Sequence, residues 1–309
     1  MNTAVAFIIF NRPDTAKRVF ESIRQARPPR LYVIADGPRL SKPGEAEAVS
    51  ATRTVIDSVD WPCEVTRLYS SENLGCKQRV YTGLNSVFEH EEQAIILEDD
   101  CLPDPTFFPY CESLLERYRD EEQVFHIGAN QFQRPRLKRP YTYYFSKFPH
   151  CWGWATWRRA WRLIDLNLST WDEAQPALAH YMKTDIEQAF WGRIFGRIRE
   201  NPSANSSWAY PWLYTMWARN CVAINSTVNL VENLGFGADA THTVEGAWCL
   251  HRKAHPLKKL IPPASITLDE AADEHTFKCN HLLQETRRWR ICWSRMRMSL
   301  GALRRKLLP

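Results

Sequence analysis

The sequence predicts an α/β protein with a mostly parallel sheet. Strand-like and helix-like segments alternate over the first ~130 residues, the strand-like segments are short and almost wholly apolar, and turn residues separate them. Strands that alternate with helices form parallel sheets with helices on both faces, so both sides of each strand are buried. The composition allows such a core, because 44% of the 309 residues are hydrophobic and 24% are charged.

The expected elements follow one another in a regular order. Residues 3–10 (TAVAFIIF) form an apolar run that is typical of a buried strand. A helix over residues 14–26 follows, with one apolar face formed by Ala16, Val19, Phe20 and Ile23. The other expected strands cover residues 30–35, 64–69, 93–97 and 123–127. The other expected helices cover roughly residues 44–58, a segment containing Val80, Leu84, Val87 and Phe88, and residues 105–118.

After residue 140 the strand pattern fades into aromatic-rich segments that we expect to be helices and loops. Nine of the thirteen tryptophans fall between Trp152 and Trp217. Residues 256–265 are rich in proline and are typical of a boundary or linker.

Polar and charged side chains follow each of the first four expected strands. They are Asn11, Arg12, Asp36, Gly37, Arg39, Glu72, Asn73, Gly75, Lys77, Glu98, Asp99 and Asp100. Open parallel sheets bind ligands at the carboxyl ends of their strands. We therefore expect several of these residues to lie around one crevice.

Three acids, Glu98, Asp99 and Asp100, directly follow the fourth strand. Carboxylates at the edge of an apolar strand lose hydration unless a cation or hydrogen-bond donors compensate. Mn²⁺ or Mg²⁺ is the expected partner, because hard divalent cations take oxygen ligands together with substrate phosphates. The alternative is a solvated acidic turn.

The sequence argues against two classes of nucleotide-binding protein, the dinucleotide-binding enzymes and the P-loop ATPases. Residues 11–14 (NRPD) lack the glycines of a dinucleotide-binding turn, and the chain has no phosphate-binding loop of the Gly-Lys-Ser/Thr type. A cation held by an acidic cluster is a different way to bind a diphosphate.

Several segments resemble GT-A glycosyltransferases, above all bacterial family-2-like transferases, some of them catalogued as haemolysin-like proteins. The segments are residues 7–23 (FIIFNRPDTAKRVFESI), 32–38 (YVIADGP), 72–88 (ENLGCKQRVYTGLNSVF), 94–115 (AIILEDDCLPDPTFFPYCESLL), 149–161 (PHCWGWATWRRAW) and 228–243 (VNLVENLGFGADATHT). The chain is more distantly similar to N-acetylglucosaminyltransferase I. The resemblance covers about residues 3–245. It implies a GT-A fold and metal-dependent transfer of a sugar from a nucleoside-diphosphate donor, chiefly a UDP-sugar. The implied acceptor is a glycan or lipid-linked saccharide in bacterial surface polysaccharide synthesis.

The resemblance also implies roles for the acidic residues. Asp100 would contact the metal that bridges the donor diphosphate, Asp99 would lie near the ribose, and Glu98 would support the cluster. His242 is the expected late ligand for the metal or a phosphate, with a hydrogen-bonded structural histidine as the alternative.

Further residues are expected at the nucleotide. By the same resemblance, Asp36 would hydrogen-bond the base and Arg12 would hold the nucleotide. Lys77 and Arg79 would lie near the base or the phosphates.

The acceptor side carries fewer indications. Trp152, Gly153 and Trp154 match a loop that lines the sugar site in the resembled enzymes, with core packing as the alternative. An inverting transfer needs a carboxylate that takes the proton of the acceptor hydroxyl. The distant relative has an aspartate where this chain has Ala209, so Asp172 is the expected catalytic base. Glu187 and Asp239 are further candidates for the base, and a retaining or inactive protein is the alternative.

The expected domain organisation is a GT-A domain over residues 1–262 and a basic extension over residues 263–309. Within the domain, residues 1–130 form the nucleotide half and residues 131–262 the acceptor half. Residues 287–309 hold eight Arg and Lys and no acid, so the rest of the chain, with 32 basic and 35 acidic residues, has no excess of positive charge. A nucleic-acid partner is therefore not expected.

The basic extension is expected to form an amphipathic helix. Its apolar residues lie at helical spacing: Trp289, Trp293, Met296, Leu300, Leu303 and Leu307. Such a helix binds an anionic membrane surface or docks on the body of the protein, and both alternatives stay open.

Cysteine spacing bears on metal and redox motifs, and the lack of long apolar runs bears on location. The nine cysteines show no two-residue spacing, so zinc and redox motifs are weakly supported. No apolar run reaches the roughly 18–20 residues of a membrane span, and no signal peptide is expected. A cytoplasmic protein follows, with peripheral attachment to the inner face of the membrane as a variant.

Two other functions remain open at this stage. One is a sugar-nucleotide nucleotidyltransferase, which would require a Gly-rich turn after the first strand. The other is a catalytically inactive GT-A-like protein that binds glycan or membrane, an alternative that Ala209 keeps open.

Overall fold

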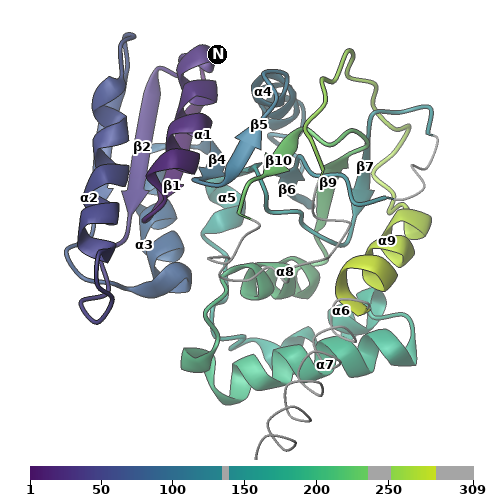
Figure 1. The fold of residues 1–309 in the computed structure, drawn as a ribbon. Coiled ribbons are helices and arrows are strands. Elements are labelled where there is room, and N and C mark those ends of the chain that lie inside the picture. Colours follow the sequence, from purple (N-terminus) through teal and green to yellow (C-terminus); the bar gives the residue numbers. More distant parts are fainter. Residues whose placement is uncertain (134–138, 236–251, 283–309) are drawn as a thin grey trace, which may run out of the picture.

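A computed structural model of the chain describes residues 1–133, 139–235 and 252–282 (Figure 1). Within these residues, one sheet has eight strands in the order β3-β2-β1-β4-β8-β6-β9-β7. In chain order these strands are β1 (Ala4–Ile9), β2 (Arg30–Ala35), β3 (Glu64–Tyr69), β4 (Gln93–Glu98), β6 (Val124–Gly128), β7 (Tyr143–Ser146), β8 (Trp154–Trp157) and β9 (Val222–Ser226). Only β7 and β8 run against the others, so the expected α/β class with a mostly parallel sheet is confirmed.

The elements expected in the first ~130 residues are all present. The helices among them are α1 (Pro13–Ala26), α2 (Glu45–Thr54) with the 3-10 turn η1 (Val55–Ser58), α3 (Gly75–His90) and α4 (Phe107–Arg117). Helix α1 begins at its proline, which suits a first helical position because the missing N–H has no partner there. It ends at Arg27 in the left-handed conformation, whose N–H donates to the carbonyl of Ile23.

The direction of chain winding changes at β1. Helix α1 connects β1 to β2 and packs on one face of the sheet, whereas α3 connects β3 to β4 and packs on the opposite face. Residues Val5 and Phe7 of β1 pack with α1, and residues Ala4 and Ala6 pack with α3. The carboxyl ends of β1 and β4 therefore lie at a topological switch point, where open α/β sheets bind their ligands.

The expectation that strands fade after residue 140 is wrong. Strands β7, β8 and β9 complete the sheet, and β8 inserts antiparallel between β4 and β6. All residues of these three strands are buried, so their sequences lack the alternation of polar and apolar residues that marks a half-buried strand. A second sheet pairs β5 (Cys101–Pro103) with β10 (Val231–Asn233).

The remaining helices follow β6 in the chain, and several of them form the lower part of the molecule in Figure 1. They are α5 (Arg158–Trp161), α6 (Trp171–Tyr181), α7 (Asp185–Glu200), the 3-10 turn η2 (Pro202–Ala204), α8 (Ala209–Ala218), α9 (Glu270–Thr276) and the π-helical turn η3 (Phe277–Leu282). No helix of the described residues is long and apolar enough to cross a membrane. The expected basic helix over residues 287–309 lies outside the described residues, and the boundary at residue 262 stays a prediction.

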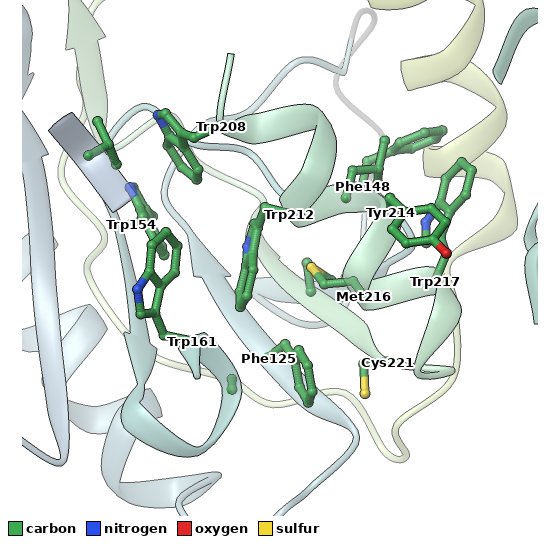
Figure 2. Close-up of a cluster of buried hydrophobic side chains, with 14 of the residues drawn as sticks. Phe125, Phe148, Trp154, Trp161, Trp208, Trp212, Tyr214, Met216, Trp217 and Cys221 are labelled. Carbon is green, nitrogen blue, oxygen red and sulfur yellow. The ribbon is translucent and has the colours of Figure 1, made fainter. Parts of the chain in front are cut away.

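Tryptophans fill the core between the sheet and α8 (Figure 2). Trp154 of β8 stacks on Trp208, with ring centroids 5.1 Å apart, and on His126, at 5.0 Å. Trp212 of α8 packs against Trp161 at 5.4 Å. Since Trp154, Trp161 and Trp212 are at most 1% exposed, this cluster is a packed core.

Candidate functional site

The ends of β1 and β4 are joined by two contacts. The backbone N–H of Phe10 donates to Oδ2 of Asp99 at 2.8 Å, and Nη1 of Arg12 contacts Oδ2 of Asp100 at 2.8 Å. Both acids follow a strand that is buried along most of its length. The structure thus brings Arg12 and the acidic triplet together at the switch point of the sheet.

Asp36 organises the loops that follow β2 and β3. Its Oδ1 accepts from the N–H groups of Gly37 at 3.0 Å and Leu74 at 2.9 Å, and its Oδ2 accepts from Gly75 at 2.9 Å. Gly75 has φ +76, a left-handed conformation that glycine adopts without strain. A carboxylate offers roughly four acceptor positions, and Asp36 uses three of them to hold these loops.

Glu45, at the start of α2, fixes the remaining loop at this edge. It is 5% exposed and accepts from the N–H of Arg39 at 2.7 Å and from Nδ2 of Asn11 at 3.1 Å. Hydrogen bonds from the Arg39 side chain lower the pKa of Glu45 to about 2. The side chains of Asn11 and Arg39 therefore both donate hydrogen bonds to Glu45.

Two acids of the triplet, Glu98 and Asp99, lie in a poorly hydrated place. Burial first, and then the charges of neighbouring acids, raise the pKa values of Glu98 and Asp99. Cys76, at the start of α3, senses the same charges: burial, followed by Glu98, Asp36 and Asp100, raises the pKa of its thiol to about 12. Cys76 is nevertheless an exposed residue.

Asp100 is also held from the other side, by the short sheet of β5 and β10. The N–H of Leu234 donates to the carbonyl of Asp100 at 2.7 Å, and the N–H of Gly235 donates to Oδ1 of Asn233 at 2.8 Å. A Cβ on Gly235 would lie 2.2 Å from Oδ2 of Asp100. Gly235 is therefore a site residue that sequence reasoning did not single out, because the only signal for it was its place in the segment 228–243.

The residues fit a cation only with help from a substrate. In the described part of the chain no three His, Cys, Asp or Glu side chains are placed to hold a metal ion. Mg²⁺ commonly takes one or two carboxylates together with substrate phosphates, however, so Asp100 suits a site that a diphosphate completes. His242, the other expected ligand, lies outside the described residues.

Lys77 and Arg79 lie one turn into α3 and point to different neighbours. Nζ of Lys77 donates to the carbonyl of Pro202 in η2. Nη2 of Arg79 donates to the carbonyl of Leu68 at 2.8 Å, and burial lowers the pKa of its guanidinium, while Asp36 acts in the opposite direction. Their contact with a nucleotide stays a prediction.

Exposure falls along the expected sugar-binding loop, from the half-buried Trp152 to the fully buried Trp154. Trp152 is partly exposed and packs edge-on against Phe132, with ring centroids 5.2 Å apart. Gly153 has φ +67, and a Cβ there would lie 2.6 Å from Cγ2 of Val231. Trp154 has no exposed surface, so of the two tryptophans only Trp152 has a face that a ligand can reach without opening the core.

The expected catalytic base is not among the residues that the structure brings together. Asp172 lies in the first turn of α6 with its side chain 87% exposed, and its Oδ1 is 3.8 Å from Arg199. Glu187 is engaged with Lys147, and Asp239 lies outside the described residues. Ala209 begins α8, close in sequence to the stacked Trp208.

No protein-family model matches the chain, and no curated protein matches it. Among solved structures, the chain is similar to a UDP-glucose pyrophosphorylase complexed with UDP-glucose, at 11% identity and a TM-score of 0.35, over 73% of this chain and 90% of that one. It is also similar to a UTP-bound UGPase from Acinetobacter baumannii, at 8% identity and a TM-score of 0.38, over 73% and 86%. A 4-diphosphocytidyl-2C-methyl-D-erythritol synthase from Anaerococcus prevotii shares 8% identity at a TM-score of 0.32, over 59% and 78%. Structural similarity at these TM-scores is too low to support a conclusion about the activity of this chain.

Proposed function

We propose that the protein is a metal-dependent GT-A glycosyltransferase that uses a nucleoside-diphosphate sugar. One observation carries the proposal: the acids at the end of β4 are bonded to the end of β1 at the switch point of the sheet. A ligand at this point meets a cation-binding carboxylate and Arg12, the components that a diphosphate requires. The sequence resemblance to GT-A enzymes supports the same conclusion, with UDP as the expected nucleotide.

The described residues suggest how the donor is held. Asp100 would supply a carboxylate oxygen to Mn²⁺ or Mg²⁺, and Glu98 and Asp99, which precede it in the chain, would support the cluster. Arg12 lies 2.8 Å from Asp100, so its guanidinium can turn toward a phosphate oxygen that approaches this carboxylate. The remaining acceptor position of Asp36 suits an N–H group of the base. When bound, the cation neutralises the diphosphate and aids departure of the nucleotide.

The second substrate is expected on the side of α8. The acceptor would be a glycan or a lipid-linked saccharide of a bacterial surface polysaccharide, and Trp152 would contact a sugar ring. Activation of its hydroxyl requires a base, for which Asp172 remains the proposed residue despite its exposed position. Peripheral attachment to the membrane through residues 287–309 belongs to the same proposal.

The competing functions predict other local structures. A nucleotidyltransferase would require a glycine-rich turn after β1, but here α1 begins at Pro13 directly after Arg12. A binding protein without catalysis would not need Glu98 and Asp99 at this place, where burial raises their pKa values and disfavours their charged forms.

A binding titration tests the proposal. The purified protein is titrated with UDP, GDP, CDP and TDP, each with and without Mn²⁺. Binding of one nucleotide should depend on Mn²⁺ and be lost in Asp100→Asn, while Glu89→Gln, which changes an exposed carboxylate on α3, should bind normally. Asp36→Ala should also lose binding, and its thermal melt must be recorded because three backbone N–H groups lose their acceptor. If the folded protein binds none of the four nucleotides, the transferase proposal fails.

A further inference from the structure

Both carboxylate oxygens of Asp100 are engaged by the protein itself. Nη1 of Arg12 contacts Oδ2 at 2.8 Å, and the thiol of the buried Cys101 donates to Oδ1 at 3.4 Å. Gly235 packs so close to Oδ2 that an added Cβ would overlap this oxygen. A divalent cation that binds Asp100 therefore has to displace a group that the carboxylate already holds.

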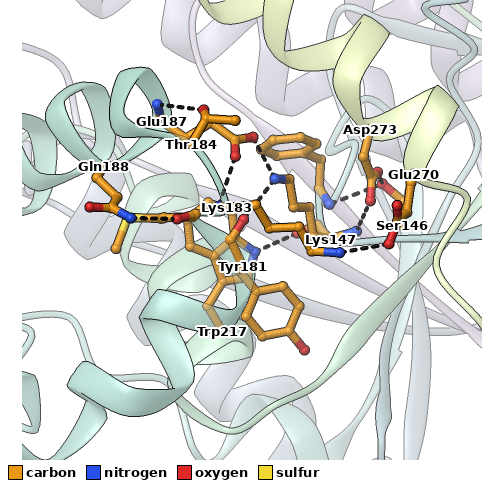
Figure 3. A network of polar contacts seen from close by, with 12 residues as sticks. Ser146, Lys147, Tyr181, Lys183, Thr184, Glu187, Gln188, Trp217, Glu270 and Asp273 are labelled. Atoms are coloured by element: carbon orange, nitrogen blue, oxygen red, sulfur yellow. Dashed lines mark hydrogen bonds and ion pairs between the residues drawn. The ribbon is translucent and has the colours of Figure 1, made fainter.

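The Arg12–Asp100 ion pair differs from an ion pair that serves the fold alone. Lys147 and Glu187 form the structural kind: both side chains are 7% exposed, and Nζ of Lys147 is 2.5 Å from Oε1 of Glu187 (Figure 3). The same Nζ donates to the carbonyl of Tyr181 at 2.7 Å. Opening that pair would leave two charges buried. The side chains of Arg12 and Asp100 are 25% and 15% exposed, so water can reach both charges when their pair opens.

Opening the pair requires no change in the backbone of Arg12. Its carbonyl accepts from the N–H of Ala16 at 3.0 Å and from Oγ1 of Thr15 at 3.3 Å, and these bonds hold the residue at the start of α1. Rotatable side-chain bonds separate the guanidinium from this backbone, so it can turn to another anion while α1 stays in place. A diphosphate is such an anion, because the N–H groups of arginine bind phosphate as they bind carboxylate.

A divalent cation and Arg12 compete for Asp100 because both are positive. Two positive charges that share one carboxylate repel each other, and the repulsion is stronger where water is scarce. In the described part of the chain no three His, Cys, Asp or Glu side chains offer the cation a site without a substrate. A bound diphosphate ends the competition, because it gives Arg12 a new anion and gives the cation further oxygen ligands.

We propose that Arg12 makes cation binding depend on the nucleotide. Its ion pair with Asp100 keeps the cation from this carboxylate in the free protein, and a nucleoside diphosphate opens the pair by drawing the guanidinium to a phosphate. This inference rests on the proposed transferase function and adds the regulation of its metal site. The cation and the nucleotide then bind as a coupled pair, in which each raises the affinity for the other by the same factor.

Mn²⁺ titrations without nucleotide test the ion pair by itself, with bound Mn²⁺ measured from the loss of the EPR signal of the free ion. Arg12→Gln removes the competing charge and should bind Mn²⁺ at least about tenfold more tightly than the wild type. Arg12→Lys keeps a positive charge and should gain little. The double variant Arg12→Gln, Asp100→Asn should lose the gain, because the cation binds at Asp100. The matched control Arg18→Gln removes an exposed arginine of α1 and should bind like the wild type.

UDP provides the second half of the test. It should raise the affinity of the wild type for Mn²⁺, and it should raise that of Arg12→Gln by a smaller factor, because no ion pair has to open in this variant. The melting temperature of Arg12→Gln should stay close to that of the wild type, since ion pairs that water reaches contribute little to stability.

The wild type also gives a readout that needs no folded Arg12→Gln. In NMR spectra of protein with ¹⁵N-labelled arginine, the Arg12 side-chain signal is identified by its absence from Arg12→Lys. This signal should move when UDP and Mg²⁺ are added together and should stay in place with Mg²⁺ alone.

Three results would overturn the inference. They are equal affinities of the wild type and Arg12→Gln for Mn²⁺ without nucleotide, a gain in Arg18→Gln as large as that in Arg12→Gln, and an Arg12 signal that UDP and Mg²⁺ leave unchanged. If the wild type binds no UDP in the presence of Mn²⁺, the transferase proposal itself fails. That failure is distinct, because the Mn²⁺ titrations without nucleotide judge the ion pair independently.

Discussion

The α-carbon of Gly235 lies against the carboxylate of Asp100, so close that an added Cβ would be 2.2 Å from Oδ2. Because the nearest atom is the end of a side chain, an alanine would turn the carboxylate and leave the backbone in place. The Gly235→Ala variant should bind UDP with Mn²⁺ about tenfold more weakly, a loss of about 1.4 kcal/mol, with a nearly unchanged thermal melt. Calorimetric titration measures the binding.

Gly192→Ala is the matched control for this variant. Nothing lies within 4 Å of a Cβ at Gly192, in the middle of α7, so alanine should leave binding intact and stabilise the helix by up to about 1 kcal/mol. Equal affinities of Gly235→Ala and the wild type for UDP and Mn²⁺ would mean that Gly235 does not position Asp100.

The sequence predicted the elements of the first ~130 residues well because they carry local patterns. Strand β1 is an unbroken apolar run, and α1 shows its buried face at helical spacing. The place of the acids after β4 then followed from the rule for parallel strands. Strand β8, with the sequence WATW, is as short as a turn of helix and buried throughout, so nothing local distinguishes it from a helical segment.

Contacts between distant segments could not be predicted from the sequence. The pairing of β5 with β10 joins three-residue strands that are about 130 residues apart, and it brings Gly235 to Asp100. The bonds from the loop after β3 to Asp36 depend equally on the fold. The sequence does not show where Lys77 is directed either, since its partner Pro202 lies 125 positions away.

His126 should make the protein sensitive to acid. It is fully buried, accepts at Nδ1 from Nε1 of Trp212 at 3.3 Å and contacts the carbonyl of His150 through Nε2 at 3.0 Å. Burial lowers its pKa to about 3. The unfolded chain takes up a proton near pH 6.5 and the folded chain does not, so the stability contributed by neutral His126 is present above about pH 6.5 and is lost as the pH falls toward 3.

Urea denaturation of the wild type and His126→Gln between pH 7.5 and pH 4.5, a range set around the free histidine pKa of about 6.5, measures this contribution. The wild type should lose stability more steeply with falling pH than His126→Gln, which lacks the titrating ring. The control His90→Gln changes an exposed histidine at the end of α3 and should follow the wild type. Parallel curves for the wild type and His126→Gln would contradict the prediction.

The ion pair of Lys147 and Glu187 should be essential for stability, because both side chains are 7% exposed. Glu187→Gln leaves a buried ammonium with neutral partners and should cost about 3–5 kcal/mol in the free energy of unfolding. The double variant Lys147→Met, Glu187→Gln should recover most of this loss. Urea denaturation measures all three proteins.

Lys183 and Glu270 provide the matched exposed pair, with N and O 2.6 Å apart and side chains 47% and 73% exposed. Glu270→Gln should change the free energy of unfolding by less than about 1 kcal/mol, since surface pairs contribute little. A loss at Glu187→Gln as small as that at Glu270→Gln would show that water reaches Lys147.

Trp152 and Trp154 should separate ligand binding from packing. Trp154 stacks between His126 and Trp208 with no exposed surface, so Trp154→Ala should cost about 3–5 kcal/mol of stability. Trp152 is partly exposed, so Trp152→Ala should cost less. If Trp152 contacts the transferred sugar, Trp152→Ala should weaken the binding of UDP-glucose and spare that of UDP, whereas Trp154→Phe should affect neither ligand selectively. Calorimetric titrations with both ligands decide this, and equal losses for UDP and UDP-glucose in Trp152→Ala would place the ring away from the sugar.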